Sequence, residues 1–340
     1  MHIQANQSLK PYNSFQIEAK TQYLIEISKQ SDIPTLRSDL KLASLPWFVL
    51  GSGSNILFVH DIQGVSVRCG YKKIQLVKED KESVWLSVGA GMIWHEFVRF
   101  TVEQGYWGLE NLALIPGTVG AAPVQNIGAY GAEARDTLTR VQALNLMTGE
   151  RREFRNADCQ FGYRTSIFKQ EYNNQLLVHR VTFKLKKLAY GHPDLTYEPL
   201  YNALKSTPKD KLTPKQIFET VIKIRQQKLP DPRQFGNAGS FFKNPIITES
   251  YFKELIAKYP QMPHHRLLNN HYKISAGWLI EQAGWKGKTH GQAGVSDKHA
   301  LVLINLGKAS GKDILELAHL IQEDINQKFG IHLEPEVTII

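Results

Sequence analysis

The chain alternates short apolar runs with amphipathic helical patterns, and this alternation limits its possible folds more than any other feature. The apolar runs at Trp47–Leu50, Val84–Val88 and Leu176–Phe183 have the length of buried strands. The segments Trp94–Glu103 and Gln216–Gln226 instead repeat apolar residues at helical spacing. Strands and helices that follow one another in this way predict domains in which both pack together.

The last helical pattern is the most regular one in the chain. Asp313 can cap its N-terminus, and Gly330 can end it. Five apolar residues fall on one face of this helix: Ile314, Leu317, Ile321, Ile325 and Phe329. A short strand-like segment, LEPEVTII, follows it.

The clearest linker is the segment KLPDPRQFGN at residues 228–237. Two prolines and a glycine interrupt a helical pattern there, and no apolar periodicity continues. We therefore predict a domain boundary that separates residues 1–227 from residues 228–340. A second polar, proline-containing stretch at residues 189–212 carries Tyr197, and we expect it to be an excursion within the first domain.

Composition narrows the class of protein. With 340 residues, 42% of them apolar, the chain can bury a substantial core, which excludes a disordered protein. Its net charge of +9 comes from scattered Lys and Arg residues, a distribution that favours small anionic ligands over a nucleic-acid groove. Cys69 and Cys159 are its two cysteines, so neither a disulfide framework nor a zinc site is encoded. No apolar segment has the length of a membrane span or a signal peptide core, and we expect a cytoplasmic protein.

Two glycine-rich segments are candidates for ligand binding. The first, GSGSN at Gly51–Asn55, follows an apolar run, where backbone N–H groups can approach phosphate oxygens. A turn that needs glycine has the same sequence, and this is the simpler explanation for that motif alone. The second segment, Ile115–Gly131, holds four glycines together with Gln125 and Asn126. Its lack of side-chain bulk favours a backbone that lies against a large ligand, although a tightly packed loop has the same composition.

Several common motifs are absent. Gly-Lys-Thr at 287–289 lacks the earlier glycine of a phosphate-binding loop, and His95-Glu96 is followed by Arg99 where zinc proteases have a second His. Neither GxGxxG nor GxSxG occurs, which disfavours a Rossmann dehydrogenase and an α/β-hydrolase.

Three short segments place polar side chains among small or aromatic residues. Arg164 lies in FGYRTSIF, Ser240 lies in GNAGSFFKNP, and Glu334 and Glu336 lie at strand spacing in LEPEV. Each can serve catalysis, and each also has a structural explanation. These explanations are a surface ion pair for the Arg, a helix cap for the Ser and an exposed strand edge for the Glu residues.

Taken in order, these segments resemble the UDP-N-acetylenolpyruvoylglucosamine reductases. The shared motifs run from about Leu9 to the C-terminus and include GSGSN, PGTVGAAPVQNIGAYG, FGYRTSIFK, KLPDP, GNAGSFFKNP, SAGWLIEQAGWKG, HALVLIN and LEPEV. Several of them are long and unusual, so chance similarity is a poor explanation.

The resemblance implies an α+β fold, the FAD-binding fold of the vanillyl-alcohol oxidase and p-cresol methylhydroxylase type. Two α+β subdomains, about residues 1–75 and 76–227, would hold FAD, and a C-terminal α/β domain at 228–340 would bind the substrate. The last strand, at 331–340, would return toward the flavin site. The resemblance is to the longer type of the family, in which an inserted segment, here 189–212, brings a tyrosine, here Tyr197, over the substrate.

The resemblance also implies non-covalent FAD, with NADPH as co-substrate. The residues implied to bind FAD are those of the two glycine-rich segments: Gly51, Ser52, Gly53, Ser54, Asn55, Gly117, Gly120, Ala121, Gln125, Asn126, Ile127 and Gly128. Many members carry a serine where this chain has Ala121, so phosphate contacts there are expected from backbone N–H groups. The segment HGQAGVSDKHA departs from the commoner wording, which leaves the roles of His290 and His299 open.

The implied reaction reduces the vinyl ether of UDP-N-acetylglucosamine enolpyruvate to UDP-N-acetylmuramate, a peptidoglycan precursor. Arg164 would stabilise the developing negative charge with its guanidinium fork. A protonated Glu336, with Glu334 the less favoured choice, would donate a hydrogen bond to that charge, and Ser240 would protonate the carbon. The substrate would be bound by Tyr130, Tyr197, Lys228 and Asn244.

Two other hypotheses stand beside this one. A basic module can hold nucleotides or RNA without catalysis, and a yellow protein with flavin absorbance would exclude it. Another oxidoreductase can share the same flavin fold. The resemblance favours a cytoplasmic, monomeric enzyme that binds neither nucleic acid nor membrane.

Overall fold

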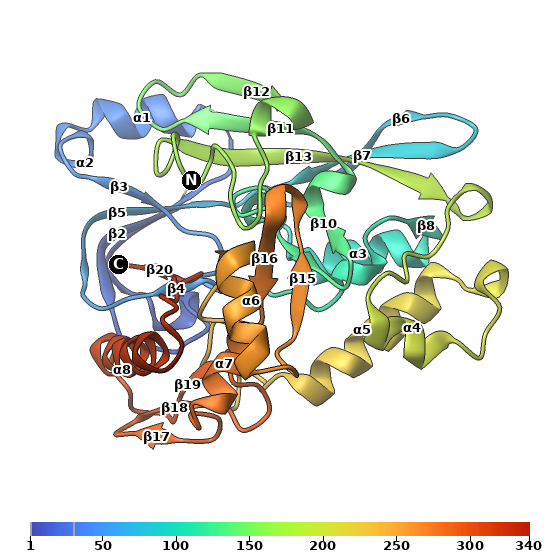
Figure 1. Cartoon of the computed structure of the whole chain (residues 1–340). Helices are drawn as coiled ribbons and strands as arrows, with labels where there is room; N and C mark the ends of the chain where they lie inside the picture. The colour runs from blue at the N-terminus through green and yellow to red at the C-terminus, as the bar shows by residue number, and fades with distance from the viewer. Residues whose placement is uncertain (1, 30) are drawn as a thin grey trace. The chain divides into compact units, whose positions relative to one another are not determined.

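The computed structural model describes residues 2–29 and 31–340, whose helices and strands are labelled in Figure 1. Its contacts group the chain into two compact units. Unit 1 consists of Met1–Gln7, Thr21–Ser52 and Ile62–Arg225. Unit 2 consists of Ser8–Lys20, Gly53–Asp61 and Gln226–Ile340. The division after Arg225 lies close to the proposed boundary at 227, but two short N-terminal segments belong with the C-terminal part of the chain.

The first sheet of unit 1 has the strand order β1-β2-β5-β3. Its strands are β1 (His2–Ser8), β2 (Lys20–Ile27), β3 (Trp47–Val49) and β5 (Ile62–Cys69). β5 pairs in parallel with β2 and β3, and the connection from β2 to β3 runs through α1 (Asp32–Ser38) and α2 (Leu40–Ala43). Ile25, Val65 and Leu36 lie in one buried cluster, so the helices cover one face of this sheet.

The second sheet of unit 1 is antiparallel, with the order β12-β11-β13-β7-β6, and β8 pairs with the end of β13. Its strands are β6 (Ile74–Glu79), β7 (Ser83–Gly89), β8 (Tyr106–Trp107), β11 (Leu138–Asn145), β12 (Arg151–Arg155) and β13 (Leu176–Lys187). α3 (Trp94–Glu103) packs on it, with the rings of Trp94 and Phe97 5.8 and 5.1 Å from that of Phe183. The predicted strands at Val84–Val88 and Leu176–Phe183 are confirmed, as is the helix at 94–103.

A small hairpin and two helices complete unit 1. The hairpin pairs β9 (Gly128–Ala129) with β10 (Ala132–Glu133), and its turn residues, Tyr130 and Gly131, have φ values of 53° and 91°. Two positive φ values in a two-residue loop are typical of a type I′ turn. The proposed excursion at 189–212 contains α4 (Glu198–Leu204), which packs in the same core as α5 (Pro214–Lys228).

Unit 2 holds two three-stranded antiparallel sheets, ordered β14-β16-β15 and β17-β18-β19, and one short parallel pair of β4 with β20. Its strands are β4 (Ile56–Leu57), β14 (Ile246–Thr248), β15 (His264–Arg266), β16 (His271–Ile274), β17 (Thr289–His290), β18 (Ala293–Val295), β19 (Leu303–Asn305) and β20 (Thr338–Ile339). Its α-helices are α6 (Glu249–Lys258), α7 (Ala276–Gln282) and α8 (Gly311–Phe329). Residues 300–304 are an apolar run in the sequence, but strand β19 begins only at Leu303.

The last helix confirms the predicted apolar face but not the predicted cap. All five apolar residues of that face are buried, and Gly330 ends α8 with a left-handed φ of 61°. The N-cap is Ser310, whose hydroxyl accepts from the Asp313 N–H, while the Asp313 carboxylate accepts from the Ser310 N–H. Asp313 is therefore the third helical residue of a capping box, whose two members, Ser310 and Asp313, have the spacing typical of this motif.

None of the helices in the described ranges has the length and apolar character needed to cross a bilayer.

Gly311, the first residue of α8, gives a test of how unit 2 is assembled. A Cβ at this position would lie 1.8 Å from the carbonyl oxygen of Phe58, in the segment 53–61. Gly311→Ala should therefore destabilise unit 2 by at least about 1–3 kcal/mol, the usual cost of overpacking. Thermal unfolding followed by circular dichroism measures the loss.

Gly277→Ala in α7 is the matched control, because its Cβ would come no closer than 3.4 Å to a neighbour, Leu301. Helix propensity favours alanine there by up to about 1 kcal/mol. Equal melting temperatures for the two variants would contradict the close approach at Gly311.

Candidate functional site

The two glycine-rich segments lie against each other within unit 1. A Cβ at Gly51 would be 3.6 Å from both the Cβ of Ala121 and the Oγ1 of Thr118. The next residue is Ser52, whose hydroxyl is buried and has no hydrogen-bond partner among the described residues. A buried hydroxyl without a partner is costly, and a bound ligand can supply the missing acceptor. The structure thus brings together two segments that were predicted to serve one ligand.

The second glycine-rich segment uses its own backbone N–H groups for packing. The Gly120 N–H donates to the Ala90 carbonyl at 2.9 Å, and the Ala121 N–H donates to the Thr118 carbonyl at 3.0 Å. A Cβ at Gly120 would lie 2.6 Å from the Cβ of Ala90, so this glycine permits a close backbone approach. The structure does not support the expectation that the Ala121 N–H serves phosphate, because a protein carbonyl already accepts it.

Gly117 and Ile127 hold this loop in place. Gly117 has a φ of 133°, and its carbonyl accepts from the Trp94 N–H at 3.0 Å. The Ile127 N–H donates to the Ala122 carbonyl at 3.1 Å. Gln125 lies between them, after the 3-10 turn η3 (Val119–Ala121) and before β9.

Asn126 is fully buried, and the protein itself uses its side chain. Its amide nitrogen donates to the Glu133 carboxylate at 2.9 Å and to the Gly162 carbonyl at 3.2 Å. Its Oδ1 accepts from the Arg135 N–H at 3.1 Å. Asn126 therefore joins the β9–β10 hairpin to the turn at Gly162, and the structure does not support a direct amide contact with a cofactor ring.

Arg164 lies at the tip of a tight turn closed by hydrogen bonds between Gly162 and Thr165. Its φ of 57° is uncommon for a residue with a side chain, and such conformations concentrate at functional sites. Its Nη2 donates to the Gly128 carbonyl at 2.9 Å. The predicted catalytic Arg is thus fixed both by its own turn and by β9.

The rings of Tyr130 and Tyr197 form an edge-to-face pair, with centroids 5.0 Å apart and planes at 82°. The guanidinium carbon of Arg225 lies 6.0 Å from the Tyr130 ring centroid. Burial raises the pKa of Tyr130 and lowers the pKa of Arg225. The structure therefore places two predicted substrate-binding residues in contact. It also places Arg225 beside them, a residue that sequence analysis did not select.

Sequence analysis also missed two buried polar residues next to this pair. Glu110 and Asn111 form the 3-10 turn η2 (Glu110–Leu112), and they are 4% and 2% exposed. Burial raises the pKa of Glu110 to about 7, and the Asp194 carboxylate adds to this shift, while backbone N–H groups oppose it. The apolar surroundings in the sequence LENLAL gave no sign that these polar side chains would be buried together.

In unit 2, Ser240 lies in an extended segment rather than at a helix end. It forms a β-bridge with Val302, and the neighbouring Phe241 N–H donates to the Leu301 carbonyl at 2.8 Å. The first α-helix after it, α6, begins at Glu249 and is capped by Thr248. The helix-cap explanation for Ser240 is therefore excluded.

Glu336 pairs with the other edge of the same extended segment. Its N–H donates to the Phe241 carbonyl at 2.7 Å, and Phe242 forms a β-bridge with Pro335. The Asn55 amide donates to the Glu336 carbonyl at 3.2 Å, which ties the end of GSGSN to LEPEV. Unit 2 thus brings together Ser240, Glu336 and Asn55 through main-chain pairing.

Glu334 has a simpler explanation than Glu336. Its carboxylate forms an ion pair with Lys243 at 3.0 Å, and the Glu334 side chain is 68% exposed. An exposed pair of this kind adds little stability, and it gives the Glu334 carboxylate a partner within the protein surface. The structure favours Glu336 over Glu334 on this ground.

Gly53 lies in a turn that needs glycine, which is the simpler explanation considered for GSGSN. Its φ is 64°, and a Cβ there would lie 1.9 Å from the Tyr12 carbonyl oxygen. Its own carbonyl accepts from the Ser14 N–H at 3.1 Å. Ser54 follows in the same turn. The second glycine of the motif is therefore required by the turn, while the first, Gly51, lies against the other glycine-rich segment.

The remaining predicted residues of unit 2 have different surroundings. The Asn244 Oδ1 accepts from the Ala276 N–H at 3.0 Å, so its NH₂ group is the part that can serve a ligand. Burial lowers the pKa of His299, and the positive charge of Lys228 lowers it further. The His299 Nδ1 accepts from the Leu301 N–H at 3.2 Å, which makes Nε2 the hydrogen donor of a neutral ring. His290 instead pairs with Glu316 at 3.3 Å on an exposed surface.

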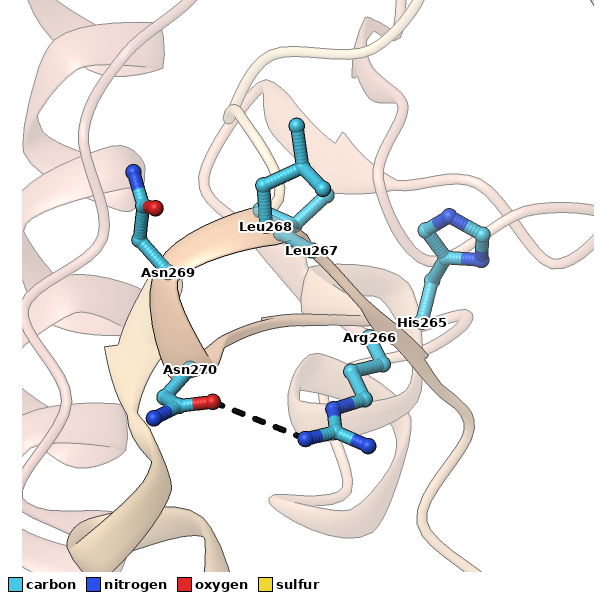
Figure 2. Close-up of a pocket in the computed structure, with 6 residues that line it drawn as sticks. All are labelled: His265, Arg266, Leu267, Leu268, Asn269 and Asn270. Carbon is cyan, nitrogen blue, oxygen red and sulfur yellow. Dashed lines mark hydrogen bonds between the residues drawn. The ribbon is translucent and has the colours of Figure 1, made fainter.

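A surface cup of about 520 Å³ lies on the β15–β16 hairpin, lined by His265, Arg266, Leu267, Leu268, Asn269 and Asn270. Figure 2 shows Arg266 and Asn270 facing each other across the hairpin, joined by a hydrogen bond of 3.5 Å. Leu268 at its tip is 90% exposed. This cup contains none of the predicted site residues. No group of three or more His, Cys, Asp or Glu residues in the described ranges is arranged to hold a metal ion.

Comparison with known proteins decides the family. The model for the UDP-N-acetylenolpyruvoylglucosamine reductase C-terminal domain matches residues 231–340, and a model for an FAD binding domain matches residues 21–155. A UDP-N-acetylenolpyruvoylglucosamine reductase of Flavobacterium johnsoniae is 43% identical over 340 residues, covering 100% of both chains. The chain belongs to the UDP-N-acetylenolpyruvoylglucosamine reductase family.

Other members support this assignment. A reductase of the same name from Photobacterium profundum is 46% identical and covers 99% of this chain and 95% of its own. The crystal structure of the Thermus caldophilus family member matches with a TM-score of 0.70 at 25% identity, over 100% of this chain and 99% of that one. The expected α+β architecture with an FAD-binding domain is confirmed.

The residues of unit 1 fit an FAD-binding role. Gly51 and Thr118 lie side by side, and the buried Ser52 hydroxyl has no partner among the described residues. Small residues around a buried donor leave room for a phosphate oxygen, which would accept from that hydroxyl. Gly51, Ser52 and Thr118 are accordingly the residues of unit 1 that would hold the cofactor.

Glu110 makes the stability of the protein depend on pH. Its folded pKa of about 7 lies above the ordinary value of 4.5, so its favourable contribution is complete below pH 4.5 and is lost as the pH rises through 7. The loss amounts to roughly 3 kcal/mol above pH 7. Because Glu110→Gln cannot ionise, the melting temperature of this variant should fall less between pH 5.5 and 8 than that of the parent.

Glu103→Gln, at the exposed end of α3, is the control and should follow the parent at every pH. Parallel pH profiles for the parent and Glu110→Gln would show that Glu110 does not titrate in this range.

Proposed function

We propose that this chain reduces UDP-N-acetylglucosamine enolpyruvate to UDP-N-acetylmuramate with NADPH, a step in the synthesis of peptidoglycan precursors. Membership of the reductase family and the match to an FAD binding domain support this reaction. The structural observation that carries the proposal is the pairing of the Ser240 segment with Glu336 and of Glu336 with Asn55. Hydrogen bonds to the main chain thus connect the segments of Ser240, the proposed proton donor, Glu336, the proposed carboxyl group, and Asn55, the end of the cofactor motif.

Bound FAD would supply two-electron chemistry that connects NADPH to the vinyl ether of the substrate. Gly51 and Ser52 would hold its phosphate groups, and the binding would be non-covalent. The chain's own side chains would then manage charge and protons.

Ser240 would deliver the proton to the α-carbon of the substrate. A serine is a weak acid, but a carbanion is basic enough to take its proton when the two are within hydrogen-bond reach. A β-bridge with Val302 fixes the position of Ser240. The next residue, Phe241, is held by main-chain hydrogen bonds to Leu301 and Glu336.

Arg164 and Glu336 would stabilise the negative charge that develops on the substrate. The guanidinium of Arg164 is already held by Gly128, so little reorganisation is needed when the charge forms. Glu336 would act in its protonated form and donate a hydrogen bond. The exposed ion pair of Glu334 makes it a poor candidate for the same role.

Substrate binding would use Tyr130, Tyr197, Lys228 and Asn244. Lys228 offers a mobile ammonium to a diphosphate, and the Asn244 NH₂ group can donate to the sugar. We infer a monomeric enzyme that acts in the cytoplasm, without nucleic-acid or membrane partners. The thiols of Cys69 and Cys159 are free, which suits a reducing compartment.

Ser240→Ala should separate the two half-reactions. NADPH should reduce the flavin of this variant at nearly the normal rate, since that step requires no proton for carbon. Reoxidation by the enolpyruvyl substrate should slow by about 10²–10⁴-fold, the usual effect of a positioned proton donor. Stopped-flow absorbance of the flavin measures each step.

Ser296→Ala is the control for the loss of a buried serine hydroxyl in unit 2, where that hydroxyl accepts from the Lys298 N–H. It should leave both half-reactions intact. Normal reoxidation in Ser240→Ala would remove Ser240 from the mechanism and leave a water or Glu336 as the donor.

Tyr197→Phe should weaken substrate binding while sparing the reaction with NADPH. Loss of one hydrogen bond to a charged group should raise KM for the enolpyruvyl substrate roughly tenfold. Tyr201→Phe, on the exposed side of α4, should change neither value. Equal losses in both half-reactions of Tyr197→Phe would mean that this segment has another role.

A further inference from the structure

The start of α3 holds both ends of the loop that leads into the second glycine-rich segment. The Trp94 indole N–H donates to the Leu112 carbonyl at 2.9 Å, and the Trp94 backbone N–H donates to the Gly117 carbonyl at 3.0 Å. The preceding residue, Ile93, forms a β-bridge with Thr118. The loop between these contacts therefore has both of its ends fixed.

Leu114, in the middle of this loop, has an uncommon backbone conformation. Its φ is 56°, in the left-handed region where a residue with a side chain is strained, so the surrounding structure must hold it there. Its N–H donates to Nδ1 of His95, the second residue of α3, at 3.0 Å. A side-chain nitrogen thus accepts the hydrogen bond from the strained residue.

The His95 ring is fixed in its orientation and in its charge. It stacks on Phe218 of α5, with ring centroids 5.3 Å apart and planes at 3°. A neutral imidazole has one acceptor nitrogen, and the Leu114 N–H uses it, so Nε2 carries the ring hydrogen. Burial lowers the pKa of His95, and the positive charges of Arg99 and Arg225 lower it further. The ring therefore keeps its acceptor for Leu114 at neutral pH.

We propose that His95 is a positioning residue for the cofactor, because it holds Leu114 and thereby sets the path of the chain into Thr118. This inference rests on the proposed role of the two glycine-rich segments in FAD binding. A Cβ at Gly51 would lie 3.6 Å from the Thr118 Oγ1, so a displaced loop would change the place where the two segments meet. A loop that is already ordered lowers the entropic cost of binding a ligand.

The test uses His95→Phe, which keeps an aromatic ring against Phe218 but removes the acceptor. Hydrogen exchange of the flavin-loaded protein should become roughly tenfold faster across residues 113–118, because the loss of one hydrogen bond makes local opening easier. The flavin should also dissociate roughly tenfold faster, which flavin fluorescence after dilution measures. His95→Leu is the second variant, in case the phenyl ring prevents folding.

His95→Asn is the conservative variant, since its Oδ1 can accept from the Leu114 N–H in place of Nδ1. Exchange and flavin dissociation should return to within about threefold of the parent. Thr101→Val is the matched control, because it removes another buried hydrogen bond of α3, to the Val98 carbonyl, and it should change neither value.

Three results would overturn the inference. The first is unchanged exchange across residues 113–118 in both His95→Phe and His95→Leu. The second is a loss in His95→Asn as large as that in His95→Phe, which would mean that the ring and not its acceptor matters. The third is an equal loss in Thr101→Val, which would mean that any weakening of α3 has this effect.

Thr118→Val separates this inference from the proposed function. If Thr118→Val releases the flavin faster but His95→Phe speeds only hydrogen exchange, then His95 does not position the cofactor segment. If neither variant releases the flavin faster, the proposed cofactor role of Thr118 fails, and the inference fails with it. Faster exchange and faster release in His95→Phe, restored in His95→Asn and absent from Thr101→Val, support the inference.

Discussion

The arrangement of unit 2 depends on one strand pairing, in which the Glu336 N–H donates to the Phe241 carbonyl. The Phe241 N–H also donates to the Leu301 carbonyl, and the preceding residue, Ser240, forms a β-bridge with Val302, so Ser240 has little freedom. Main-chain hydrogen bonds are well suited to this task because they do not depend on which side chains the segment carries. The side chains of this segment can therefore vary without loss of the pairing, and the backbone fixes their positions with the precision that catalysis requires.

In unit 1, side chains fix the positions of the loops that carry the predicted site residues. Asn126 and Asn111 are both buried amides, and each donates to main-chain or carboxylate oxygens of segments far apart in the sequence. Loops with many small residues have few apolar contacts that could order them, so polar contacts with fixed directions take over. Arg164, at the tip of its own turn, is ordered in the same manner by the Gly128 carbonyl.

Helices and strands could be predicted from the sequence better than these contacts of buried polar side chains. The helix at 94–103 and the apolar face of the last helix follow from periodicity, which reports burial directly. The assignment of the cap of that helix to Asp313 is wrong. A Ser followed three residues later by an acidic residue forms a capping box, in which the Ser is the cap. Motif resemblance selected Arg164, Ser240 and Glu336, but it could not show that Asn126 is saturated by protein contacts. Nothing local in the sequence revealed Glu110, because its raised pKa results from burial by residues elsewhere in the chain.

The division of unit 2 into three separated segments affects how the chain can fold during synthesis. Its two N-terminal segments, 8–20 and 53–61, are made early, yet their partners lie in residues 226–340. Gly311, for example, packs against the carbonyl of Phe58 only after some 250 intervening residues have been made. Contacts over such long sequence separations form slowly. The two early segments can pair with each other through Ser14 and Gly53, but their contacts with residues 226–340 must wait. Folding of this enzyme can therefore be completed only after its C-terminal third has emerged.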